Sequence, residues 1–165
     1  MSSIFSIEEI VLINNLLYFE NFGNPRAAFL SAFNEYVNIG EYIKGMSELV
    51  TLDDDKQYTT GMLGYEYKEI INAIKQNEHV QRLAIREIHI EGAEAGGGRS
   101  VYLFDPVARE AVVAFKGTEG DAEWVDNVSG LYKVPTDFQQ NALAWFQSLS
   151  FEDCDTITVT GHSVF

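Results

Sequence analysis

Several residue types are scarce in this sequence, and each scarcity removes a class of protein. Among the 165 residues Cys154 is the only cysteine, which excludes an internal disulfide and gives no sign of an oxidising compartment. Only 11 basic residues accompany 25 acidic ones, for a formal net charge of -14. Such a chain repels phosphate backbones and anionic headgroups, so we expect no nucleic-acid partner.

Long hydrophobic runs are missing as well. No stretch approaches the roughly 20 apolar residues that a membrane-spanning helix needs. The N-terminus has no basic start, and Glu8 and Glu9 interrupt any apolar signal core. We therefore expect a soluble cytoplasmic protein without a transmembrane segment.

The sequence also lacks the motifs of metal and cofactor sites. Asp53-Asp54-Asp55 has neither the alternating ligands nor the closing glutamate of a calcium-binding loop, so it is predicted to be a solvated loop. Gly96-Gly97-Gly98 is followed by neither a helix nor the Lys-Ser/Thr pair of a phosphate-binding loop. No metal ion and no cofactor is expected.

The first eighty residues predict a mainly helical segment. Ser6 and Glu9 match a capping box, which marks the start of a first helix. Asn24-Pro25 supplies a cap and a first-turn proline for a second helix that ends before Gly40. Apolar residues at helical spacing mark a third helix. The predicted helices cover residues 7–19, 25–39 and 67–77.

From Arg82 onward the pattern is that of strands. Apolar residues alternate, and their phase shifts between Ile85 and Ile88, which predicts a β-bulge. Extended segments on either side of Gly96-Gly97-Gly98 predict a hairpin. Residues 111–115 are apolar at every position, as expected for a central strand covered on both faces.

The last part of the chain predicts a strand-helix-strand unit. Thr136 and Gln139 match a second capping box, and apolar residues then follow at helical spacing as far as Leu149. The β-branched run 156–160 is a short strand, parallel to the strand at 111–115. These elements predict a single α/β domain, with a helical lead-in at 1–80 and a sheet core at 82–163.

Two motifs follow the two predicted parallel strands. The strand at 156–160 leads into Gly161-His162-Ser163, the first part of a nucleophile elbow, in which a tight turn lifts a serine out of the sheet. The strand at 111–115 leads into Lys116-Gly117-Thr118, with Trp124 and Asn127 shortly afterwards. In this order the motifs resemble the class 3 lipase family, and most closely its bacterial lipase-like relatives of uncharacterised function.

The resemblance covers roughly residues 83–163 and implies an α/β-hydrolase fold that cleaves an acyl ester or lipid through an acyl-enzyme. It implies that Ser163 is the nucleophile and that Thr118 and the backbone N–H of Val164 form the oxyanion hole. The supporting residues that it implies are Gly117, Trp124, Asn127 and Gly161.

The sequence departs from the family directly after the serine. The family continues with a Gly-Gly pair, whereas here Val164 and Phe165 are the last residues. The acid and the histidine of the triad should follow Ser163, because this fold orders them so. We therefore expect a truncated front half of a hydrolase domain, with little turnover and with self-association through an exposed sheet edge.

Other residues and another class of function are also considered. His79, His89 and His162 are expected to be surface or packing histidines and not the catalytic base. Catalysis by Cys154 with His162 would need two groups on one strand and its exit to meet. The alternative from another class is a non-catalytic binding protein that uses its acidic helical face or its open sheet edge.

Overall fold

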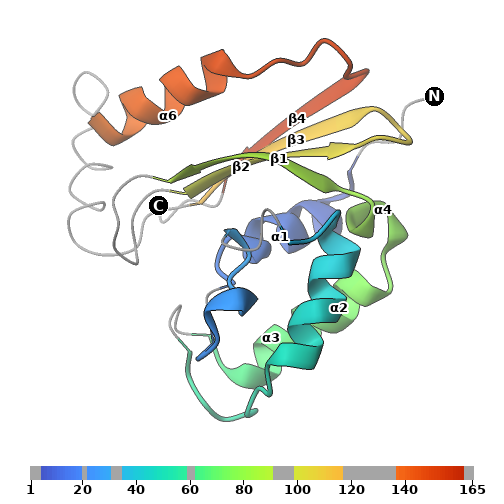
Figure 1. Cartoon of the computed structure of the whole chain (residues 1–165), viewed down its shortest axis with the longest axis vertical. Helices are drawn as coiled ribbons and strands as arrows, with labels where there is room; N and C mark the ends of the chain where they lie inside the picture. The colour runs from blue at the N-terminus through green and yellow to red at the C-terminus, as the bar shows by residue number, and fades with distance from the viewer. Residues whose placement is uncertain are drawn as a thin grey trace.

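The computed structural model describes residues 5–19, 22–30, 35–58, 62–90, 99–116 and 137–161. These residues form an α/β structure in three layers (Figure 1). A four-stranded sheet lies in the middle, helix α6 covers one of its faces, and the helices of the N-terminal half cover the other.

Helix α1 (Ile7–Leu16) starts at the predicted capping box. The Ser6 hydroxyl accepts a hydrogen bond from the Glu9 N–H, and the Glu9 carboxylate accepts one from the Ser6 N–H. These two bonds satisfy backbone donors that the first turn of a helix leaves without partners. The prediction of this helix is confirmed, although it ends three residues before the expected position 19.

The predicted second helix is wrong. Pro25 begins only the 3-10 turn η1 (Pro25–Ala27), after which Ala28 is extended. The Phe29 N–H donates to the Phe19 carbonyl at 3.1 Å, and the Phe29 side chain is fully buried. This pairing with the end of α1 holds the segment out of helical geometry, because tertiary contacts override a local cap.

Helix α2 (Ile39–Leu49) begins where the second helix was expected to end. Asn38 caps it by accepting from the Glu41 N–H at 2.9 Å. Gly40 therefore lies inside the first turn of a helix and does not terminate one. The sequence signal was present in Asn38 but was not recognised.

The remaining N-terminal helices are α3 (Gly64–Lys75) and the single-turn α4 (Glu78–Gln81). Helix α3 confirms the third predicted helix. The loop before it contains Asp53-Asp54-Asp55, all exposed, as predicted for a solvated loop. Among the described helices, none has the length and apolar character needed to cross a membrane.

The sheet contains β1 (Ala84–Ile90), β2 (Arg99–Asp105), β3 (Glu110–Phe115) and β4 (Thr156–Gly161). They lie side by side in the order β1-β2-β3-β4. The first three are antiparallel neighbours, whereas β3 and β4 are parallel and are connected through α6 (Asp137–Ser148). The predicted hairpin, central strand and strand-helix-strand unit are confirmed, and the register shifts between Ile85 and Glu87 at the predicted bulge.

Two hydrophobic clusters cover the two faces of the sheet. The larger one contains Val112 and Ala114 of β3 and packs against the N-terminal helices. The smaller one contains Ala111 and Val113, with Trp145 and other side chains of α6 and its C-terminal end. Strand β3 is thus buried on both sides, which explains why it is apolar at every position.

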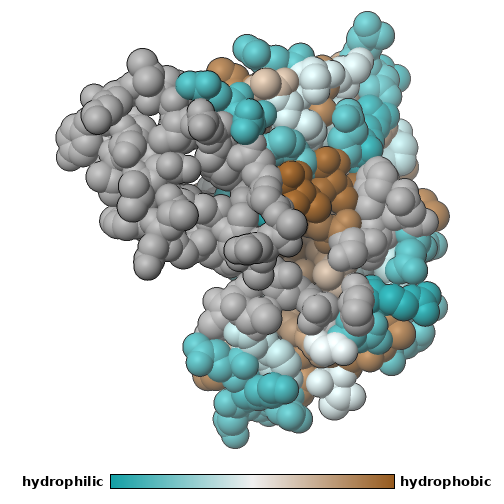
Figure 2. Space-filling model, turned by 60° about the vertical axis from the view of Figure 1, so that its left-hand side comes forward, coloured by the Kyte–Doolittle hydropathy of each residue, from teal (hydrophilic) through white to brown (hydrophobic). Residues whose placement is uncertain are grey.

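The α6 face of β4 is more open. Ile157 and Val159 pair with Ala111 and Val113 of β3, so they point to the same face of the sheet. They are nevertheless 48% and 54% exposed. On the face that Figure 2 shows, hydrophobic side chains gather near the middle of the surface, with mostly hydrophilic ones above them.

Candidate functional site

Most of the site residues implied by the sequence motifs lie outside the described part of the chain. Gly161 is described, as the last residue of β4. The others fall in the two stretches without description, which cover 117–136 and 162–165. The residues concerned are Gly117, Thr118, Trp124, Asn127, Ser163 and Val164.

The structure does describe the two strands that lead to the motifs. Phe115, at the end of β3, pairs with Gly161, at the end of β4. Because the two strands are parallel neighbours, the chain leaves both of them at the same edge of the sheet (Figure 1). The next residue, Lys116, is still fixed, since its N–H donates to the Arg99 carbonyl at 2.7 Å.

Helix α1 contacts this edge of the sheet. The side-chain amide of Asn14 donates to the Thr160 hydroxyl at 3.1 Å. This bond links α1 to the C-terminal end of β4. Lys116 is 2% exposed, and its ammonium group lies 5.1 Å from the centre of the Tyr18 ring. Within the described residues, Asn14 Oδ1 is a buried oxygen without a hydrogen-bond partner. Asn14 was not predicted as a site residue, although a polar residue in the apolar stripe of a helix is a usable signal. Lys116 was noted only as part of the Lys116-Gly117-Thr118 motif.

A second polar cluster lies at the opposite end of β3. His79 of α4 is between two glutamates: its Nδ1 is 2.9 Å from Glu9 and its Nε2 is 2.7 Å from Glu110. The ring stacks on Phe5, with ring centroids 4.1 Å apart. The side chain of Glu110 is 1% exposed. This histidine therefore packs in the interior and joins α1, α4 and β3.

Asp105 lies beside this cluster, at the end of β2. It accepts from Arg82 at 3.0 and 3.1 Å, and from the N–H groups of Val107 and Ala108 at 2.9 and 3.3 Å. Burial alone would raise the pKa of Asp105, but the Arg82 and backbone hydrogen bonds hold it below its usual value. The buried carboxylate is thus kept ionised by its partners.

The pKa of Glu9 depends on the same opposing effects of burial and of hydrogen bonds. Burial would raise its pKa, whereas the hydrogen bond from the Ser6 N–H and the charge of His79 lower it, and the net shift is downward. The pKa values of Asp105 and Glu9 are thus both lowered, so ionised carboxylates lie near the His79 imidazole. No motif in the sequence indicated this grouping, because its members come from distant elements.

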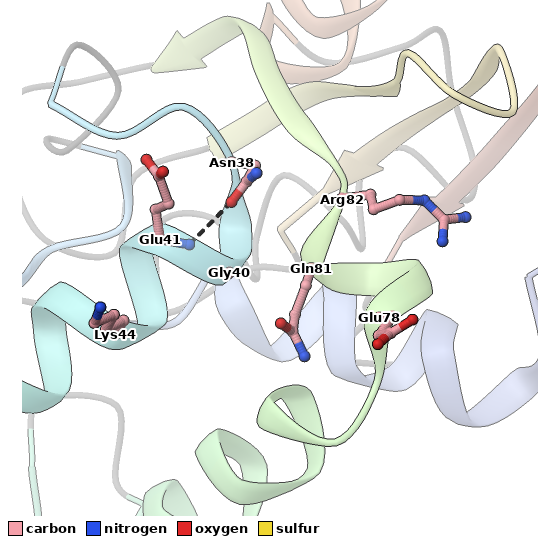
Figure 3. A pocket seen from close by; sticks show the side chains of 7 residues that line it. All are labelled: Asn38, Gly40, Glu41, Lys44, Glu78, Gln81 and Arg82. Carbon is pink, nitrogen blue, oxygen red and sulfur yellow. Dashed lines mark hydrogen bonds between the residues drawn. The ribbon is translucent and has the colours of Figure 1, made fainter.

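A shallow hollow of about 400 Å³ opens between α2 and α4 (Figure 3). Its lining mixes acids, bases and amides, and the side chains of Gln81 and Arg82 point in different directions. Because no set of like groups converges there, the hollow lacks the arrangement of a specific binding site.

The other candidate side chains have structural surroundings. Cys154 is half-buried and packs at the edge of the smaller cluster, where its sulfur lies 3.4 Å from the Tyr102 hydroxyl. His89 stacks on Trp145, as expected for a packing histidine. His162 lies outside the described residues.

Comparison with known proteins adds no relative. No family model matches the sequence, and neither the curated proteins nor the solved structures gave a significant match.

Proposed function

We propose that this chain is the front part of a lipase-like serine hydrolase domain that cleaves acyl esters. The observation that supports this most directly is the parallel pairing of β3 and β4, with Phe115 opposite Gly161. In α/β sheets, ligands bind beyond the carboxyl ends of the strands. Both sequence motifs follow strands that end at this edge.

The spacing supports a shared site. Thr118 follows Phe115 by three residues, and Ser163 follows Gly161 by two. Neighbouring strands lie about 4.8 Å apart, and an extended residue spans about 3.3 Å. The few residues between each strand end and its motif residue are therefore enough for Thr118 and Ser163 to lie close together. A Thr118 N–H near the Ser163 hydroxyl is the arrangement that an oxyanion hole requires.

In the proposed reaction, the Ser163 oxygen attacks the ester carbonyl, and the negative charge that develops on the carbonyl oxygen is held by the N–H groups of Thr118 and Val164. Each well-placed donor lowers the barrier by roughly 3 kcal/mol. Expulsion of the alcohol leaves an acyl-enzyme, which water then hydrolyses. In this fold the acid and the base follow the nucleophile along the chain, so both are expected after Ser163.

A fluorophosphonate probe tests the role of the serine. We expect the natural protein, isolated from its source, to be labelled at Ser163, because the probe reacts with activated serine hydroxyls. Labelling should disappear in Ser163→Ala and persist in Ser148→Ala, since Ser148 lies on α6 and its hydroxyl donates to the Trp145 carbonyl. Absence of labelling in the folded natural protein, or labelling that survives in Ser163→Ala, would overturn the hydrolase proposal.

One observation supports a second candidate, a non-catalytic protein that binds a partner through β4. Ile157 and Val159 are about half exposed, and in the order of the described strands β4 stands at the end of the sheet. An extended segment of a partner could pair with such a strand. Tight partner binding without serine labelling would favour this function over hydrolysis.

A further inference from the structure

The cluster around His79 has no part in the proposed hydrolysis. Within the described residues, His79, Asp105 and Glu110 are the one group whose potential ligand atoms all lie within 4.8 Å of one another. They come from α4, from the end of β2 and from the start of β3. Asp105 and Glu110 are both fully buried.

Each nitrogen of the His79 ring faces a carboxylate: Nδ1 lies 2.9 Å from Glu9, and Nε2 lies 2.7 Å from Glu110. An ionised carboxylate only accepts hydrogen bonds, so both contacts of His79 are hydrogen bonds when both ring nitrogens carry a proton. The carboxylates of Glu9, Asp105 and Glu110 thus lie around one imidazole, and those of Asp105 and Glu110 are buried. Buried charged groups are either paired or coordinate a metal ion.

We propose that His79 Nε2 and the carboxylates of Asp105 and Glu110 bind one divalent cation of the zinc class. The metal takes the place of the proton on Nε2, which is released to solvent, and Glu110 changes from hydrogen-bond acceptor to ligand. Asp105 exchanges one of its hydrogen bonds for the metal.

The chemistry of the ligands selects the class of metal. An imidazole nitrogen with two carboxylates suits Zn²⁺ and its first-row neighbours, whereas Ca²⁺ needs six to eight oxygen ligands. Glu9 supplies a feature that is typical of metal-binding histidines. Its carboxylate accepts from Nδ1 at 2.9 Å, which fixes the ring and leaves Nε2 to face the metal.

The test is titration calorimetry of the metal-stripped protein with ZnCl₂ in two buffers of different ionisation enthalpy. We expect one Zn²⁺ per chain and release of about one proton, since a proton leaves Nε2. Glu9→Gln should weaken binding by roughly 10-fold to 100-fold, because it loses the charge that orients His79. His89→Gln, which changes a histidine stacked on Trp145, should bind as the unchanged protein does.

A second measurement needs no variant at the buried positions. X-ray absorption at the zinc edge of the loaded protein should give one imidazole nitrogen, with oxygens as the other ligands. Absence of binding in a folded sample, a coordination shell with no imidazole or with more than one, or unchanged affinity in both Glu110→Gln and Asp105→Asn would overturn the proposal. Loss of serine labelling in the separate probe experiment would not bear on it, because the two sites share no residue.

Discussion

At the scale of single residues, buried charges account for the contacts that connect distant segments. Glu110 and Asp105 lie on either side of the turn between β2 and β3. Glu110 contacts His79 of α4, and Asp105 contacts Arg82, the C-terminal cap of that helix. Removing one partner of a buried pair costs several kcal/mol, because the other charge stays buried. These partners could not be predicted from the sequence, because the spacing of residues 79, 105 and 110 matches no known metal-binding motif.

Arg86 and Asp153 form a different kind of ion pair, at the surface. The two terminal nitrogens of the Arg86 guanidinium, Nη1 and Nη2, donate to the Asp153 carboxylate at 2.9 and 2.5 Å. This pair joins β1 to the loop before β4. The hydrogen bond from Arg86 lowers the pKa of Asp153 to about 2 from its ordinary 3.8. The pair is therefore sensitive to acid.

This shift gives a prediction with a defined sign. A carboxyl whose pKa is lower in the folded state stabilises the fold above its unfolded pKa, and the stabilisation is lost as the pH falls through the folded value. Urea unfolding of the protein and of Asp153→Asn should thus differ by a constant amount above about pH 5, and the difference should shrink as the pH falls through 3.8 and then 2, reaching zero only near about pH 1. A difference that is independent of pH over this range would contradict the assigned pair.

At the scale of elements, the sequence predicted the regular patterns and missed the exceptions. Alternation, the fully apolar run at 111–115 and the β-branched run at 156–160 identified the strands, including the bulge between Ile85 and Glu87, because these patterns are local in the sequence. The prediction of a helix after Pro25 was wrong because the hydrogen bond from the Phe29 N–H to the Phe19 carbonyl holds this segment in another conformation. No local sequence signal indicates such a tertiary hydrogen bond. Of the site implied by the motifs, the parallel strands are described and the reacting groups are not.

The start of α3 gives a prediction at this scale. A Cβ added at Gly64 would lie 1.8 Å from the carbonyl oxygen of Asp53, which is a backbone atom that cannot rotate away. Gly64→Ala should therefore destabilise the fold by on the order of 1–3 kcal/mol, the usual cost of overpacking. Gly40→Ala is the matched control in α2, where the added carbon meets the Gln81 side chain at 3.0 Å and that chain can move. Equal midpoints for both variants in thermal unfolding would refute the close approach of the loop to α3.

At the scale of the whole molecule, the exposed face of β4 predicts self-association. Ile157 and Val159 present apolar surface on β4, and within the described residues β4 has one neighbouring strand, β3. Despite the net charge of -14, we expect a concentration-dependent rise in sedimentation coefficient. Val159→Lys should weaken the association, because it places a charge on that surface.

Val107→Lys is the control for this prediction. Val107 is 77% exposed and lies in the turn between β2 and β3, so the same change there should leave association unaltered. If the protein sediments as a monomer at all concentrations, or if both lysine variants behave alike, the role assigned to β4 is wrong.

The central claim is that the segments after β3 and β4 meet in one site, and disulfide trapping tests it most directly. In a Cys154→Ala background, oxidation of the T118C/S163C double variant should rapidly form an intramolecular disulfide, because such a bond needs Cα atoms within about 7 Å. The T118C/D155C pair should cross-link far more slowly, since Asp155 precedes β4 at the opposite end of the strand. Cross-linking of the first pair that is no faster than that of the second would contradict the account.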